Sequence, residues 1–183
     1  MRVLNAQEAG SYLDTVGMKI DGWNRLCDAS GREHSQKHRV RYQAPKGARE
    51  LYNFAQDVAS WLPNTGWKIF QIDNSTWTSD DEEFLVRRLL FTSTERASLP
   101  PTLLFEVESG GADEELLLSS VIYLFLLFEY YGDVVSSGSR NGKHIWICDG
   151  FVYFCSFDDN DLAEAKALVT RFEKTALRVG TRR

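Results

Sequence analysis

The most apolar stretch of the chain runs from Leu116 to Phe128 and is interrupted only by Ser119 and Ser120. Wound at the helical period, it leaves no polar face, which predicts a helix over residues 113–131 that is buried on nearly all sides. A membrane span would need roughly 20 apolar residues, and here acids close both ends of a shorter run. We therefore expect the central helix of a soluble domain and no association with membranes.

Apolar periodicity predicts further elements on both sides of this helix. The predicted helices cover residues 6–16, 45–62, 79–91 and 158–180. The predicted strands cover residues 67–73, 102–108, 132–138, 143–148 and 151–157, and a half-exposed strand is expected at the end of the segment 22–45. This order predicts a single α+β domain over residues 1–183. We expect a mixed or antiparallel sheet, a C-terminal three-strand meander, and helices packed on one or both faces.

Two Asx-Gly pairs, Asn141-Gly142 and Asp149-Gly150, predict the tight turns of the meander. If Asp149-Gly150 forms a two-residue loop, alternation along the two strands decides which side chains share a face. The core face is expected to carry Ile145, Ile147, Val152 and Phe154. The other, less obviously buried face is expected to carry His144, Trp146, Cys148, Phe151, Tyr153 and Cys155.

Composition and charge narrow the choice of partner more than the choice of fold. The 183 residues, 43% hydrophobic and 26% charged, suit one globular domain. A net charge of −5 weighs against nucleic acid and favours a basic partner. The three cysteines have no framework spacing and the N-terminus lacks the apolar core of a signal peptide, so we expect a cytoplasmic protein with reduced thiols. Its oligomeric state is not readable from these features.

The meander face offers one candidate catalytic pair. His144 opposite Cys155 would place a base near a thiol, but neither an orienting Asn or Asp nor a glycine-rich oxyanion turn follows. A metal held by Cys148, Cys155 and His144 would need a fourth ligand from elsewhere, and ligands on one strand face seldom converge. The favoured interpretation is that the cysteines pack as small hydrophobic side chains. We predict no catalytic residues, no cofactor and no metal.

The segment of residues 22–45 is the one basic patch in an acidic chain. Its cations are Arg25, Arg32, Lys37, Arg39 and Arg41. His34 and His38 lie four residues apart within it, but a cationic neighbourhood repels a metal ion, so we expect a solvated basic loop. A nucleic-acid patch, with arginines near Trp23 and Tyr42, is a weaker alternative because the total charge is negative.

Acidic residues gather at three predicted helix starts, where capping and the helix dipole favour them. Capping uses one carboxylate and leaves the others in water. Trp77 beside Asp80 and Asp81 adds an aromatic anchor, a composition typical of interaction surfaces. The expected partner-binding residues are Trp77, Asp80, Asp81, Glu82, Glu83, Asp158, Asp159 and Asp161.

Several segments together resemble a known family. They are residues 67–77 (WKIFQIDNSTW), Phe105-Glu106, Leu127-Phe128-Glu129 at the end of the apolar helix, and residues 149–153 (DGFVY). Through them, residues 65–175 are similar to the immunity proteins of bacterial contact-dependent growth-inhibition systems. The resemblance implies a non-catalytic cytoplasmic antidote that binds and neutralises a cognate toxin domain, often a nuclease. The alternatives are a Cys/His-dependent enzyme that uses the hairpin face of residues 144–155, and a regulatory or adaptor domain with another partner.

Overall fold

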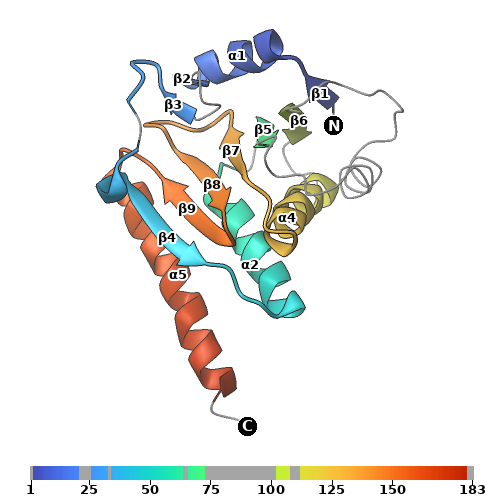
Figure 1. Ribbon diagram of the computed structural model, residues 1–183, viewed down its shortest axis with the longest axis vertical. Helices are drawn as coiled ribbons and strands as arrows, with labels where there is room; N and C mark the ends of the chain where they lie inside the picture. Colours follow the sequence, from blue (N-terminus) through green and yellow to red (C-terminus); the bar gives the residue numbers. More distant parts are fainter. Residues whose placement is uncertain are drawn as a thin grey trace.

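The computed structural model describes residues 2–20, 26–32, 34–63, 66–72, 102–107 and 112–180 (Figure 1). Within these residues the chain forms an α+β fold with four helices, a large antiparallel sheet and a separate two-stranded sheet. The predicted fold class is therefore confirmed. The predicted helix over residues 79–91 lies outside the described residues.

The helices and strands follow the predicted order closely. The helices are α1 (Ala6–Thr15), α2 (Ala48–Trp61), α4 (Ala112–Leu127) and α5 (Asp159–Gly180), with a short 3-10 helix η1 (Gln36–His38). The strands are β1 (Arg2–Leu4), β2 (Met18–Ile20), β3 (Leu26–Asp28), β4 (Arg39–Gln43), β5 (Gly66–Ile72), β6 (Thr102–Val107), β7 (Gly132–Ser136), β8 (His144–Cys148) and β9 (Phe151–Cys155). Sequence periodicity missed β1, β2 and β3, because three residues are too few to establish alternation.

The large sheet has the strand order β1-β6-β5-β7-β8-β9-β4, and every neighbouring pair is antiparallel. The predicted meander is its β7-β8-β9 portion. β4 comes from far earlier in the chain, yet it pairs with β9 and forms the last strand of the sheet. The strands β2 and β3 pair with each other in the smaller sheet.

The meander turns have the backbone that the Asx-Gly pairs predict. Asn141 and Gly142 have φ values of 53° and 68°, and Asp149 and Gly150 have 52° and 72°. Positive φ at both central residues is typical of the type I′ turn. Asp149-Gly150 forms the two-residue loop of the β8-β9 hairpin, whereas Asn141-Gly142 forms a turn inside the longer connection between Ser136 of β7 and His144 of β8. The predicted register of the β8-β9 hairpin is confirmed. Trp146 lies opposite Tyr153, His144 opposite Cys155 and Cys148 opposite Phe151.

One face of the large sheet packs against α2, α4 and α5, and Figure 1 shows α2 and α4 next to each other. Phe70, Val134, Ile145 and Phe154 are fully buried on this face. The ring of Phe154 meets that of Trp61 from α2 edge-on, with centroids 5.2 Å apart. This layer is the main hydrophobic core.

The central helix α4 is less buried than the sequence predicts. Val121, Ile122 and Phe125 are buried against the core, but Leu116 and Leu127 are 51% and 44% exposed. A helix that lies on one face of a sheet, with α2 along one flank, keeps an outward side whatever its sequence. The expectation of burial on nearly all sides was therefore wrong. Among the described helices, none has the length and apolar character needed to span a membrane.

A second, smaller core lies on the opposite face of the sheet. Leu13 of α1 and Met18 of β2 pack there with Ile69 of β5 and Val135 of β7. Figure 1 shows α1 and the two short strands gathered above one end of the sheet. This cover reaches β5 and β7, and among the described helices none lies over β8, β9 and β4 on that face.

Candidate functional site

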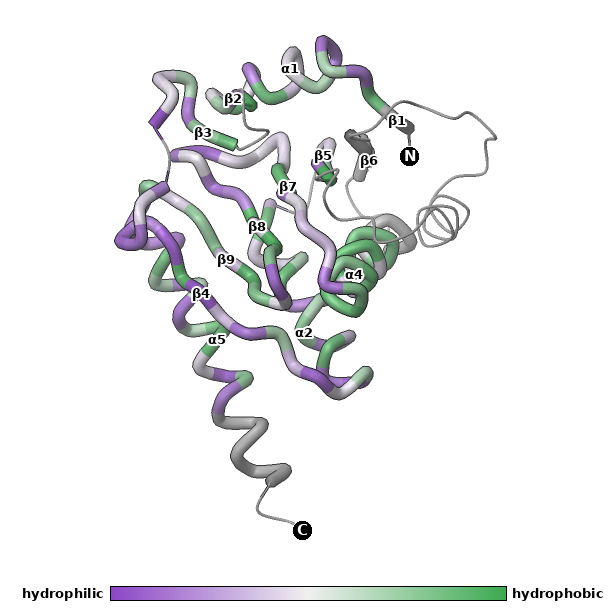
Figure 2. The backbone as a smooth tube through the Cα atoms, viewed as in Figure 1, coloured by the Kyte–Doolittle hydropathy of each residue, from purple (hydrophilic) through white to green (hydrophobic). Residues whose placement is uncertain are grey.

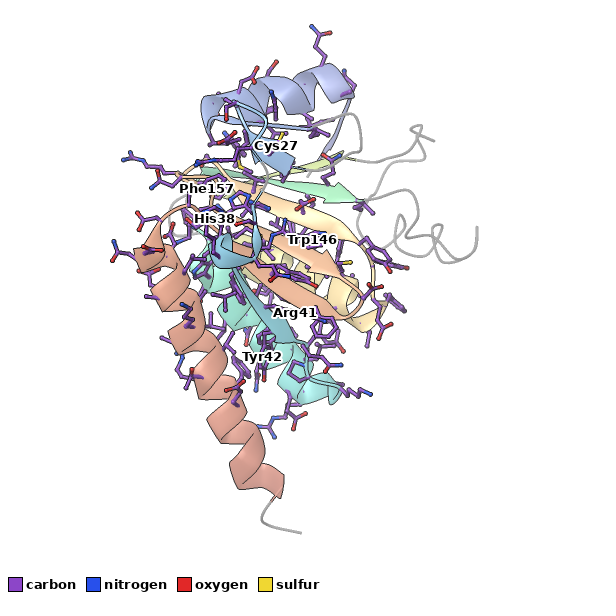
Figure 3. All side chains as sticks on the ribbon, turned by 60° about the vertical axis from the view of Figure 1, so that its left-hand side comes forward. Cys27, His38, Arg41, Tyr42, Trp146 and Phe157 are labelled. Carbon is purple, nitrogen blue, oxygen red and sulfur yellow. The ribbon has the colours of Figure 1, made fainter. Side chains whose placement is uncertain are left out.

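The uncovered part of the sheet carries a defined set of side chains, which we call the open face. Register and alternation along β4, β8 and β9 place them together. The open face consists of Arg39, Arg41, Gln43, Trp146, Cys148, Phe151 and Tyr153. All of these side chains are exposed or half-buried. Figure 3 labels Arg41 and Trp146 on this face, and also Tyr42, whose ring packs on Phe54 on the other side of the strand.

Arginines and aromatic rings form a stacked ladder across the open face. The Trp146 and Tyr153 rings stack with centroids 4.3 Å apart. The Arg41 guanidinium lies 3.6 Å from the Phe151 centroid, and that of Arg39 lies 5.1 Å from the Trp146 centroid. Each cation–π contact contributes about 0.5–1 kcal/mol at a partly exposed site. A guanidinium held in this way keeps its N–H edge available for a planar acceptor such as a carboxylate.

The charges of the two ladder arginines are not neutralised within the described part of the chain. Neither Arg39 nor Arg41 forms an ion pair with a described carboxylate. The Nε atom of Arg39 is buried and has no hydrogen-bond partner among the described residues. Buried N–H groups are nearly always paired in proteins. Figure 2 shows η1 and β4 as largely hydrophilic beside the mostly hydrophobic β9.

At one end of the open face, three histidines and a phenylalanine form a histidine cluster: His34, His38, His144 and Phe157. The His34 ring stacks on Phe157 with centroids 4.0 Å apart and meets the His144 ring edge-on at 4.7 Å. The Arg32 guanidinium lies 3.7 Å from the Phe157 centroid. Figure 3 shows His38 and Phe157 near each other at the start of β4.

The cluster corrects the expectation of a solvated basic loop at His34, which is only 3% exposed, whereas Arg32 and Lys37 are exposed as expected. Pairing of β4 with β9 brings the preceding residues onto the Asn141-Gly142 turn. A Cβ atom at Gly142 would lie 2.8 Å from the His34 ring, so the close approach requires glycine there. Among the residues with described positions, no three His, Cys, Asp or Glu side chains are arranged to hold a metal ion.

The two buried histidines are neutral at neutral pH. Burial lowers the pKa of His34 to about 3, and repulsion from His144 in its protonated form and from Arg39 acts in the same direction. Burial also lowers the pKa of His144 to about 4, although the Gly142 carbonyl beside its ring opposes this shift. The cluster therefore adds little positive charge of its own to the arginines around it.

The candidate Cys155 and His144 pair occupies the register that the sequence predicts, but its environment is wrong for a nucleophile. Cys155 is 1% exposed, and burial raises the pKa of its thiol far above the usual range. The Nδ1 atom of His144 lies 2.8 Å from the Gly142 carbonyl oxygen, and its Nε2 atom lies 3.6 Å from Asp133 Oδ1. Thiol nucleophiles need a lowered pKa, so Cys155 is better described as a packed hydrophobic side chain.

The predicted acidic surface is only partly described. Trp77, Asp80, Asp81, Glu82 and Glu83 lie outside the described residues. At the start of α5, Asp158 accepts a hydrogen bond from the Asn160 backbone at 2.8 Å. Asp161 accepts hydrogen bonds from Ser156 Oγ and Lys143 Nζ, both at 2.7 Å. Of this group, Asp159 is the exposed carboxylate, while Asp158 and Asp161 are half-buried and engaged in these internal contacts.

Comparison with known proteins gives no support for any family: no family model, no curated protein and no solved structure matches the chain. The resemblance to immunity proteins therefore stays a hypothesis.

Sequence reasoning placed the hairpin aromatics on one face but did not connect them with Arg39 and Arg41. The alternation of Arg39, Val40 and Arg41 was a usable signal for a half-exposed strand. The partner of that strand could not be read, because β4 and β9 are distant in the chain.

Proposed function

We propose that the protein is a non-catalytic binding module that captures a partner protein through its open face. The observation that carries the proposal is the ladder of Arg39, Arg41, Trp146 and Tyr153, stacked and partly exposed on rigid strands. Trp, Tyr and Arg are the residue types most enriched in interface hot spots. Side chains already held in place lose little conformational entropy on binding.

The more specific form of the proposal is the antidote that the resemblance implies, a protein that neutralises a toxin domain in the cytoplasm. An antidote needs no chemistry of its own, and the raised pKa of the Cys155 thiol weighs against the enzyme alternative. Contact of a basic toxin with Trp77, the acids of residues 80–83 and Asp159 stays part of the proposal as a second surface. Asp158 and Asp161 contribute less to it, because internal contacts engage them.

The test is capture of the partner from cells of the source organism by the tagged chain and two charge-reversal variants. Arg39→Glu with Arg41→Glu alters the open face. Lys166→Glu with Arg171→Glu makes the same change in net charge at exposed positions of α5, which packs on the opposite face of the sheet. Both variants are first checked for an unchanged thermal unfolding midpoint.

We expect the open-face variant to retain at least tenfold less partner than the native chain, and the control variant to retain a similar amount. Equal retention by the two variants, or no partner bound by the native chain, would refute the proposal. A third variant, Asp159→Lys, tests the start of α5. Loss of the partner in this variant alone would move the interface to that end of the molecule.

A further inference from the structure

The strand β4 is the last strand of the large sheet, and in the described part of the chain no strand lies along its outer edge. Two backbone hydrogen bonds, one just beyond each end of β4, show which residues of this strand bond to β9. The Ser156 N–H donates to the His38 carbonyl at 3.1 Å, and the Ala44 N–H donates to the Gly150 carbonyl at 2.9 Å. Hydrogen-bonded positions alternate in an antiparallel ladder, so the intervening residues direct their N–H and C=O groups outward. These residues are Arg39, Arg41 and Gln43, and of their backbone groups the Arg39 N–H already donates to the Gln36 carbonyl of η1.

The same three residues carry their side chains on the open face, where Arg41 and Gln43 are exposed and Arg39 is half-buried. We propose that the outer edge of β4 receives an extended acidic segment of the partner protein as an added strand, whose carboxylates bind Arg39 and Arg41. This inference rests on the proposed function and specifies how the partner is held. Such strand addition gives affinity through main-chain hydrogen bonds and specificity through alternate side chains.

The geometry of an added strand suits the charges on β4. Side chains directly opposite each other on paired strands lie about 4.5–5.5 Å apart between Cβ atoms. Acidic residues at alternate positions of the incoming segment would therefore face Arg39 and Arg41 in turn. Each guanidinium is braced against an aromatic ring, and carboxylates accept its N–H groups in pairs.

The arginines also explain why this edge would select its partner. Charged side chains on an edge strand discourage pairing with arbitrary strands. Two cations at Arg39 and Arg41 oppose a basic segment and leave an acidic one favoured, which is discrimination by repulsion as well as attraction.

A single-stranded nucleic acid would offer phosphates to the same arginines, but the open face suits it less. Platforms for bases need free aromatic faces, whereas here Arg41 covers Phe151, and Trp146 and Tyr153 stack on each other. Nucleic acid also lacks the amide groups that would pair with the edge of β4.

The inference is tested by fluorescence anisotropy of the native chain with labelled probes at physiological salt. The first probe is a capped peptide of alternating Glu and Val. Two further peptides have the same Glu-Val sequence with N-methyl groups on every second backbone nitrogen. In one peptide the odd-numbered nitrogens are methylated, and in the other the even-numbered ones. A Lys-Val peptide and a single-stranded oligo-dT of similar length complete the set.

We expect the Glu-Val peptide to bind, the Lys-Val peptide not to bind, and one N-methylated register to lose at least tenfold in affinity. Arg41→Glu should weaken Glu-Val binding at least tenfold, whereas Lys166→Glu, at an exposed position of α5, should leave it unchanged. Equal binding of both N-methylated peptides would show that the peptide binds through its charge and not through backbone hydrogen bonds. That result would overturn strand addition. Tighter binding of oligo-dT, or no binding of the Glu-Val peptide, would also overturn it.

Failure of strand addition is separable from failure of the proposed function. If the cellular partner is lost from the Arg39→Glu and Arg41→Glu variant but no acidic peptide binds, the open face is the interface and its mode of binding is different. If that variant retains the partner, both the open face as the interface and strand addition at β4 are refuted.

Discussion

Mild acid should destabilise this protein through its two buried histidines. His34 and His144 have pKa values of about 3 and about 4 in the folded chain, against about 6.5 in an unfolded one. Protonation therefore favours the unfolded state. The cations Arg32 and Arg39 oppose a further positive charge on these rings, whereas the Asp133 carboxylate, 3.6 Å from His144 Nε2, favours one.

The sign and size of the effect follow from proton linkage. Well above pH 6.5 both histidines are neutral in both states and contribute no pH dependence. Below that pH the unfolded chain binds more protons, and each histidine lowers the free energy of unfolding by about 1.4 kcal/mol per pH unit. At pH 5 the two together remove about 2 to 4 kcal/mol, the lower figure allowing for screening by water. Asp28, with a pKa lowered to about 2, acts in the same direction but only at lower pH.

Urea unfolding at pH 7, 6 and 5 measures this loss, with His34→Phe as the matched comparison. Phenylalanine keeps a ring stacked on Phe157 but cannot titrate. We expect the decrease in unfolding free energy between pH 6 and pH 5 to be about half as large in the variant as in the native chain. An equal decrease in both proteins would refute the assignment of His34 as a buried neutral histidine.

Three further predictions test the packing described above. Thiol alkylation of the native chain at neutral pH should modify the half-buried Cys148 before the buried Cys155, and faster labelling of Cys155 would revive the enzyme alternative. Phe154→Ala should lower the free energy of unfolding by about 3–5 kcal/mol in urea titrations, because the ring is fully buried in the core; a loss below about 1 kcal/mol would contradict that placement. Asp161→Asn should cost about 1–3 kcal/mol by the same assay, because it leaves Lys143 without its closest carboxylate, and an unchanged stability would show that this contact is not maintained in solution.

Local patterns in the sequence were sufficient for much of the fold. The Asp149-Gly150 pair specified a two-residue loop, and that loop alone determined the pairing of His144 with Cys155 across the hairpin. Periodicity likewise located α2 and α5, since both helices bury one regular apolar stripe. For α4 the uniformly apolar sequence was misleading, because composition does not reveal how many sides of a helix have neighbours.

The candidate site was harder to predict because it depends on contacts between distant segments. Nothing near Arg39 in the sequence indicates that its guanidinium lies over Trp146. The burial of His34 likewise depends on β4 lying beside β9 and on the Gly142 turn. The acids of α5 were located correctly at a helix start, but the contact of Asp161 with Lys143 requires the neighbouring turn to be in place.

The most direct test of the open face as the functional surface is photo-crosslinking in cells of the source organism. A benzophenone amino acid replaces Phe151 on the open face in one variant and Tyr52 of α2, whose ring lies against Tyr123 on the helical side, in another. The account predicts a discrete crosslinked partner from position 151 and none from position 52. A partner crosslinked from position 52 alone, or from neither position, would contradict it.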